Sequence, residues 1–174
     1  MSKSILIPAT LLTCAALFAG NPQSPSAQAS LTLGGKSITI KYSAPSVRGR
    51  QIFGPDGRIS KDPTWPVWRA GADDATALHT DADLVINGLN VPKGDYTVFA
   101  LVNVNPWQLI INKQTKQWGL SYDAKQDLGR VPMTVTKPSA PIETFKITLS
   151  GAGNKGKLQM EWENVIASVP FTVK

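Results

Sequence analysis

Apolar and polar residues alternate along most of the chain with a period of two. Ile38, Ile40 and Tyr42 alternate with serine, threonine and lysine, a pattern typical of a half-buried strand. Similar apolar or alternating runs recur down the sequence. We expect strands at 37–43, 84–86, 96–102, 107–112, 131–135, 145–149, 158–162 and 165–173.

Turn residues separate these runs. Asn87-Gly88 is a strong tight-turn pair, and Gly-rich or Pro-Lys-Gly segments occur at 91–95 and 151–156. Pro132 cannot donate a ladder hydrogen bond, so the strand around it should lie at a sheet edge. With about eight strands and no convincing amphipathic helix, the sequence predicts an all-β fold, an antiparallel β-sandwich or jelly roll.

The N-terminal segment has the three parts of an export signal. Lys3 precedes an apolar run over 5–19, helix-breaking residues follow, and Ala27-Gln28-Ala29 provides a small-x-small cleavage pattern. We therefore expect residues 1–29 to be a signal peptide cleaved after Ala29, and 30–174 to form one exported domain, periplasmic or secreted. The alternative is a retained N-terminal anchor, although the run is short for a spanning helix.

Cys14 is the chain's single cysteine. Leu11–Cys14 loosely resembles a lipoprotein signal, but Thr13 is large for the position before the cysteine, and the apolar run continues after it. We therefore do not expect lipid anchoring. Without residues 1–29 the chain has no thiol, which excludes thiolate catalysis and thiolate metal ligation.

Charge adds little to this interpretation. Of 18 basic residues only Lys3 lies in the expected signal, which leaves 17 against 12 acidic residues, a net charge of +5. The basic residues are scattered, as on a solvated surface. We expect no nucleic-acid partner and no transmembrane segment in the mature chain.

One stretch, from Ser43 to Gly71, has no period. It is rich in arginine, tryptophan and proline: Arg48, Arg50, Arg58, Arg69, Trp65, Trp68, Pro45, Pro63 and Pro66. Long irregular stretches in compact domains are commonly functional or disordered. Tryptophans beside arginines favour an ordered, functional stretch.

Several motifs in this order resemble a known family: 45–54 (PSVRGRQIFG), 68–76 (WRAGADDAT), 92–96 (PKGDY), Trp107, Trp118-Gly119 and Tyr122. Together they are similar to the bacterial domain of unknown function 2911 family (DUF2911). The resemblance implies an exported, β-rich bacterial domain with no assigned activity. The two positions that are usually Asn and Glu in the family are Asp73 and Asp74 here.

The ligand-binding candidates are Arg48, Arg50, Trp68, Arg69, Asp73 and Asp74. A flat indole beside the five-donor fork of an arginine suits a small polar ligand, such as a sugar or carboxylate, or an envelope component. The structural alternative is that Arg69 pairs with Asp73 or Asp74 to hold a loop, with Trp68 as a plug beneath it. The first hypothesis is thus a non-catalytic binding or interaction module.

The second hypothesis is a hydrolase-like enzyme that uses Asp73 or Asp74 as base, Arg69 as an anion stabiliser and His79 as a proton carrier. Adjacent strand residues point to opposite faces, so both aspartates serve one site only if the backbone bends. The more ordinary interpretation of His79 is a surface strand residue. Asp81 and Asp83 lack calcium-loop spacing, so we expect no metal and no cofactor. For Trp107 and Trp118, core packing is favoured over sugar stacking.

Overall fold

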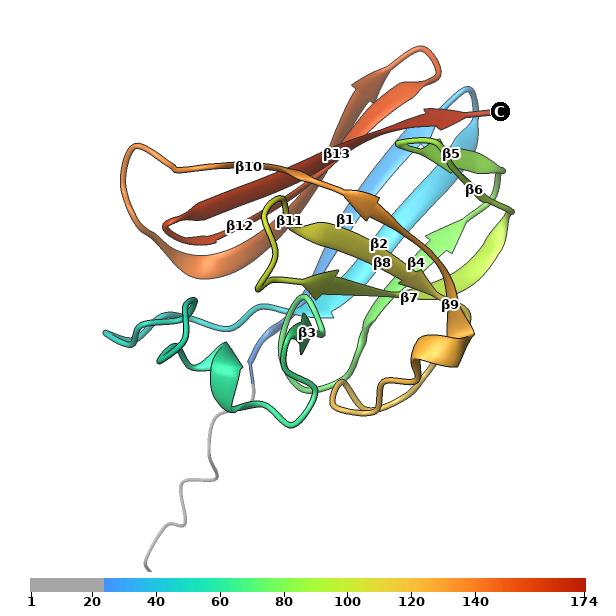
Figure 1. The fold of residues 1–174 in the computed structure, drawn as a ribbon. Coiled ribbons are helices and arrows are strands. Elements are labelled where there is room, and N and C mark those ends of the chain that lie inside the picture. Colours follow the sequence, from blue (N-terminus) through green and yellow to red (C-terminus); the bar gives the residue numbers. More distant parts are fainter. Residues whose placement is uncertain (1–23) are drawn as a thin grey trace, which may run out of the picture.

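The computed structural model describes residues 24–174. Two antiparallel sheets face each other across an apolar core (Figure 1). The prediction of an all-β antiparallel sandwich is confirmed. Residues 1–23 of the expected export signal, including Cys14, lie outside the described residues.

The first sheet has the strand order β1-β2-β4-β7-β8-β9, and β3 extends it by pairing with β7. Its strands are β1 (Ser26–Leu33), β2 (Lys36–Ser43), β3 (Val67–Trp68), β4 (Thr76–Thr80), β7 (Gly94–Leu101), β8 (Gln108–Asn112) and β9 (Asp127–Pro132). β9 pairs only with β8 along this path, so the segment with Pro132 lies at an edge, as its missing N–H predicts.

The second sheet has the order β11-β12-β13-β5-β6, and β10 pairs with β13. Its strands are β5 (Leu84–Ile86), β6 (Leu89–Val91), β10 (Thr134–Thr136), β11 (Ile142–Ala152), β12 (Lys155–Glu163) and β13 (Val165–Val173). Asn87 and Gly88 both have positive φ, 42° and 91°, and form the expected tight turn between β5 and β6.

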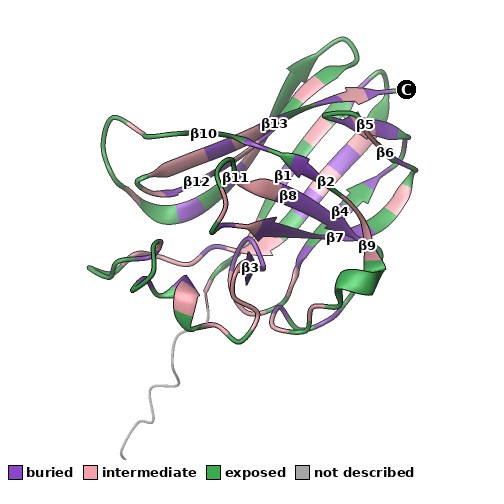
Figure 2. Ribbon diagram, viewed as in Figure 1, coloured by how far each residue is buried: buried purple, intermediate pink, exposed green. Residues whose placement is uncertain are grey.

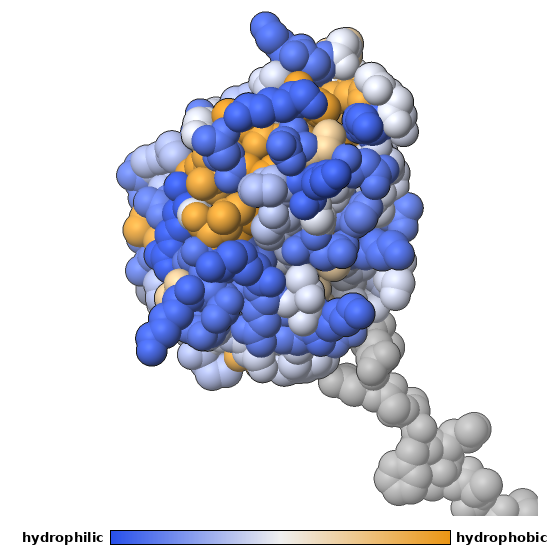
Figure 3. Space-filling view, turned by 90° about the vertical axis from the view of Figure 1, so that its right-hand side faces the viewer, coloured by the Kyte–Doolittle hydropathy of each residue, from blue (hydrophilic) through white to orange (hydrophobic). Residues whose placement is uncertain are grey.

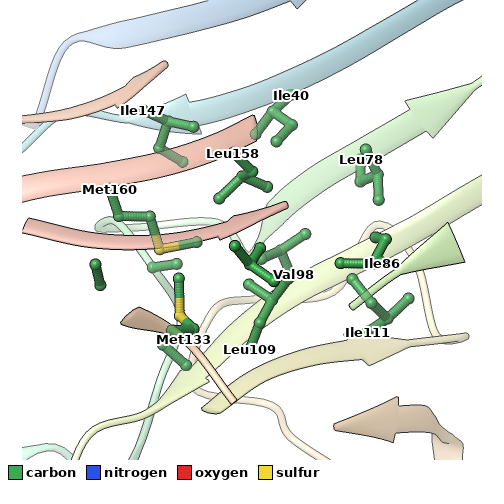
Figure 4. Packing of buried hydrophobic residues seen from close by; sticks show 14 of the residues in the cluster. Ile40, Leu78, Ile86, Val98, Leu109, Ile111, Met133, Ile147, Leu158 and Met160 are labelled. Atoms are coloured by element: carbon green, nitrogen blue, oxygen red, sulfur yellow. The ribbon is translucent and has the colours of Figure 1, made fainter. Parts of the chain in front are cut away.

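The core lies between the sheets and follows the period-two pattern of the sequence. Figure 4 shows Ile40, Leu78, Val98 and Leu109 of the first sheet packed with Ile147, Leu158 and Met160 of the second. Figure 2 shows that burial is most continuous along β7 and β8, the central strands of the first sheet. The face on the right of Figure 1 is largely hydrophilic, with a smaller apolar area (Figure 3).

The structure has thirteen strands within residues 24–174, compared with about eight expected. Among the additional strands, β3, β6 and β10 contain two or three residues each, too few for a period to show in the sequence. The other additions include β1, which overlaps the expected end of the export signal. The Ala27-Gln28-Ala29 motif is paired with Ile40, Lys41 and Tyr42 of β2.

The irregular stretch is ordered and covers one end of the sandwich (Figure 1). Val47 N donates to Glu143 O and Phe145 N donates to Pro45 O, so the start of the stretch is attached to β11. Ile52 and Ile59, the latter in the 3-10 turn η1 (Ile59–Lys61), are buried in the main core. This stretch brings its arginines to the end of the sandwich.

The first half of β1 should contribute to stability. A chain that starts at Ser30 loses the pairing of 26–29 with β2, whereas one that starts at Ser24 keeps it. Each lost backbone hydrogen bond contributes about 0.5–1.5 kcal/mol. We therefore expect the shorter chain to melt at a lower temperature in a calorimetric comparison; equal melting temperatures would show that this half of the strand contributes nothing.

Candidate functional site

Trp68, at the end of β3, is the base on which the candidate site is built. It is 2% exposed, stacks on Trp162 with ring centroids 5.8 Å apart, and meets Phe145 and Phe53 edge-on at 5.0 Å and 5.6 Å. Its Nε1 donates to the Gly71 carbonyl at 3.1 Å. The indole is therefore the floor of the site, and its polar atom is used within the protein.

Arg69 follows Trp68 directly and is only 9% exposed. Its Nη2 lies 3.3 Å from Asp62 Oδ2, its Nη1 donates to the Asp73 carbonyl at 3.5 Å, and its guanidinium lies 5.9 Å from the centre of the Trp118 ring. Its Nε is buried and has no hydrogen-bond partner among the described residues. Burial lowers the pKa of this guanidinium, whereas the nearby Asp62 carboxylate raises it.

A glycine makes the position of Arg69 sterically feasible. A Cβ on Gly119 would overlap the Arg69 side chain and the Asp73 carbonyl oxygen. Gly119 N also donates to this carbonyl at 3.1 Å, which attaches the 117–119 segment to the segment that follows Arg69. Only a residue without a side chain allows this close approach.

The ion-pair partner of Arg69 is Asp62, which the sequence analysis did not single out. Asp62 is shared: Arg58 Nη1 lies 2.8 Å from its Oδ1. The expected side-chain pairing of Arg69 with Asp73 or Asp74 is wrong, because Asp73 offers its backbone carbonyl instead. One feature of the sequence points to Asp62 as an ion-pair residue: it lies four residues after Arg58, and residues four apart in a helical turn are neighbours.

The two adjacent aspartates face different surroundings. Asp73 has φ 57°, and its carboxylate accepts a hydrogen bond from Ser24 N at 3.2 Å in the hollow beside Arg69. Asp74 is exposed and lines a second hollow, on the outer face of the first sheet. The structure therefore does not bring the two carboxylates of the hydrolase hypothesis together.

The hollow beside Arg69, which we call the arginine pocket, has a volume of about 360 Å³. This lies at the lower end of the range of about 300–1,000 Å³ for small-molecule sites. Five of the six candidates, all except Asp74, line it. Its lining also includes Arg58, Asp62 and Trp118, besides Trp162, Leu120, Ile59 and residues of segments 24–25, 44–46 and 71–72.

Three arginines of the pocket are exposed, and two of these, Arg48 and Arg50, lie before the 3-10 turn. Arg50 is held in place by its own turn, because its Nε and Nη2 donate to the carbonyls of Val47 and Ser46 at 2.9 Å and 2.7 Å. The Arg48 backbone N donates to Glu143 Oε1 at 2.9 Å. Within residues 24–174, neither arginine side chain forms a salt bridge, so their positive charges are uncompensated.

Trp118 is 50% exposed at the border of the pocket, so the expectation that it packs in the core is wrong. Its loop is held by Tyr122, which donates to Asp127 Oδ2 at 2.7 Å and accepts from Arg130 Nη2 at 2.7 Å. Burial and the adjacent Asp127 raise the pKa of Tyr122 to about 12. Trp107, in contrast, packs on Phe53 as expected.

His79 lies on β4, away from the arginine pocket. Its Nδ1 lies 2.8 Å from Asp95 Oδ1 and its Nε2 lies 3.1 Å from Asp81 Oδ1. Both ring nitrogens thus face carboxylates, and their hydrogen bonds raise the pKa of His79, that of Asp95 most. The side chain is exposed, as expected for a surface strand residue.

Residues 24–171 match the pattern of the family described as Protein of unknown function (DUF2911). The chain belongs to this family. Comparison with curated proteins and with solved structures finds no match. Three of the motifs that carry the family resemblance, 45–54, 68–76 and Trp118-Gly119, meet in this member, since Arg48, Trp68, Arg69, Asp73 and Trp118 all line the arginine pocket.

Helix length and the arrangement of possible metal ligands are two further properties of this DUF2911 member. Both helices within residues 24–174 are 3-10 turns of three residues, so neither is long enough to cross a bilayer. No group of three or more acidic or histidine side chains in that range is arranged to hold a metal ion.

Removing the shared carboxylate should destabilise the protein more than removing its exposed partner. In Asp62→Asn, Arg69 stays buried without a counterion, which costs about 3 kcal/mol. In Arg58→Met, the lost side chain is 45% exposed, and the cost is about 1 kcal/mol or less. Urea unfolding measures both values; equal losses would show that Asp62 does not compensate Arg69.

Stability should depend on pH through His79. Because its pKa is raised in the folded protein, its contribution is full below the unfolded value of about 6.5 and is lost as pH rises through the folded value. We expect His79→Gln to lower the melting temperature at pH 5.5 and to have progressively less effect towards pH 8.5. Asp95→Asn should reduce the pH dependence of the melting temperature that His79 causes. If His79→Gln lowers the melting temperature by the same amount at every pH, the prediction is wrong.

Proposed function

We propose that this protein is a non-catalytic binding module that holds a small anion, a carboxylate or a phosphate, in the arginine pocket. The observation that carries the proposal is the excess of guanidinium groups in one hollow. Four arginines and two aspartates line the pocket, which leaves a formal charge of +2. Charge-assisted hydrogen bonds from arginine to carboxylate or phosphate are among the strongest in proteins.

The arrangement of the four arginines supports this role. Arg58 and Arg69 share Asp62, which fixes their positions and offsets part of their charge. Arg48 and Arg50 are left with their charges uncompensated, and Arg50 is oriented by two backbone carbonyls before any ligand arrives. Preorganised donors lose less entropy when a ligand binds.

The buried Nε of Arg69 supports it further. A buried donor without a partner costs about 1–3 kcal/mol, and this cost is recovered if a ligand oxygen accepts from it. We place the module in the periplasm or outside the cell, on the basis of the signal-like pattern of the first 29 residues. Residues 24–28 line the two hollows, so the proposal keeps them in the exported chain instead of removing them with the signal. In that setting a small anion or an anionic group of an envelope component is the expected ligand.

Neutralising Arg48 and Arg50, the two pocket arginines without a salt bridge among the described residues, tests the proposal. We expect phosphate or a sugar acid to bind to the protein, and Arg48→Gln with Arg50→Gln to weaken that binding at least tenfold, because each lost charge-assisted hydrogen bond contributes about 1.5–3 kcal/mol. Isothermal titration calorimetry at low salt measures the dissociation constants.

The matched control is Lys155→Gln with Lys157→Gln. It removes the same charge from exposed residues of β12 that line neither hollow. Binding in the control should stay within twofold of the unsubstituted protein. A panel of carboxylates and phosphates that does not bind, or equal losses in both double variants, would overturn the proposal.

A further inference from the structure

A second hollow, which we call the sheet groove, lies over the outer face of β1, β2, β4 and β7. Its volume is about 1,000 Å³. The exposed residues of neighbouring strands form its floor: Lys41 pairs with Ala77, and Thr39 pairs with His79, which pairs with Asp95. The groove is thus a shallow channel across a sheet whose opposite face packs on the core.

The loop that bears Trp118 forms one wall of this groove. Thr97, on β7, donates from its Oγ1 to Gln114 O at 2.8 Å, and the same Oγ1 lies 3.2 Å from Gln117 Oε1, so the loop folds over β7. Gln117 is 9% exposed, and its Nε2 has no partner among the described residues. Gln117 is therefore a buried polar residue in the wall of the groove.

The sheet groove and the arginine pocket are adjacent. On four chain segments, one residue lines the pocket and its immediate neighbour lines the groove: Pro25 and Ser26, Ala44 and Ser43, Asp73 and Asp74, Trp118 and Gln117. The ridge between the two hollows includes a strip of backbone, in which 73–75 and 117–119 are joined by hydrogen bonds from Ala75 N to Gln117 O and from Gly119 N to Asp73 O. A ligand longer than one ring can cross it and occupy both.

The two hollows differ in chemistry. In the groove, Lys41 and Lys116 balance Asp74 and Asp95, and most other lining side chains are hydroxyls, amides or alanine. Neutral hydrogen-bonding groups around a floor that contains small side chains suit a polyhydroxylated chain. A peptide would bind through apolar pockets or a free strand edge. The floor strands β2 and β4 are paired on both sides, and β1, the edge strand of this sheet, lies at the margin of the groove.

Trp118 stands where the two hollows meet. Its ring is 50% exposed, with the Arg69 guanidinium 5.9 Å from the ring centre. An aromatic ring that keeps an exposed apolar face offers a flat surface for a ring-shaped ligand. The cationic pocket, the aromatic surface and the polar groove follow one another in space.

We infer that the ligand is an acidic oligosaccharide. A carboxylate-bearing sugar at its end occupies the arginine pocket, the ring passes Trp118, and the following units lie along the sheet groove. This inference rests on the proposed function and adds the ligand class and a second subsite. The pocket supplies charge recognition, and the groove supplies length recognition.

The test compares galacturonic acid with its trimer in the unsubstituted protein and in Ala77→Trp. Ala77 is exposed on the groove floor, and tryptophan is well accepted in strands. We expect the trimer to bind the unsubstituted protein at least tenfold more tightly than the monomer in calorimetric titrations. In Ala77→Trp the monomer should bind unchanged, and the trimer should bind no better than the monomer.

The controls separate the outcomes. Ala152→Trp places the same side chain at an exposed position that lines neither hollow, and should leave both affinities unchanged. A trimer that binds no tighter than the monomer overturns the oligosaccharide inference and leaves the proposed function in place. If the affinity of triglutamate exceeds that of glutamate by as much as the affinity of the sugar trimer exceeds that of the sugar monomer, the inference is overturned in favour of an acidic peptide. If neither sugar nor phosphate binds, the proposed function itself fails.

Discussion

The aromatic cluster around Trp68 is the contact on which the rest of this end of the molecule depends. Trp68 from the first sheet and Trp162 and Phe145 from the second meet in stacked and edge-on contacts, and Phe53 of the irregular stretch completes the group. An open sandwich exposes its apolar interior at each end. Here the aromatic rings bury that interior and fix the irregular stretch in place.

The position of the arginines follows from this closure. Because Trp68 is fixed in the core, the next residue, Arg69, is held against the 117–119 segment, where Gly119 leaves room for its buried side chain and Asp62 compensates its charge. A buried guanidinium is costly without such a partner. Asp62 serves two arginines at once, and the uncompensated charge of the pocket therefore resides on Arg48 and Arg50.

The sequence predicted the regular strands well and the site in part. Runs such as Phe145, Ile147 and Leu149 show the period of a half-buried strand, and that period depends only on local geometry. Five of the six candidate residues converge in one pocket because the irregular stretch and the turn after β3 fold together. The partner of Arg69 was not predicted, since the choice between Asp62 and Asp73 depends on the path of the chain. The exposure of Trp118 depends likewise on a loop held by Tyr122 and Asp127.

The ridge between the two hollows makes the length of the segment from Arg69 to Asp74 important, besides the identity of its residues. Asp73 lines the arginine pocket and Asp74 lines the sheet groove, so a deletion between Arg69 and Asp73 that leaves the backbone path unchanged would bring Asp74 into the pocket, and an insertion would bring Asp73 into the groove. The same holds for the segment of Gln117 and Trp118. A substitution at Asp73 or Asp74 changes one hollow, whereas a single-residue shift would move one negative charge from one hollow to the other. The spacing from Trp68 to Asp74 is therefore itself part of the binding surface.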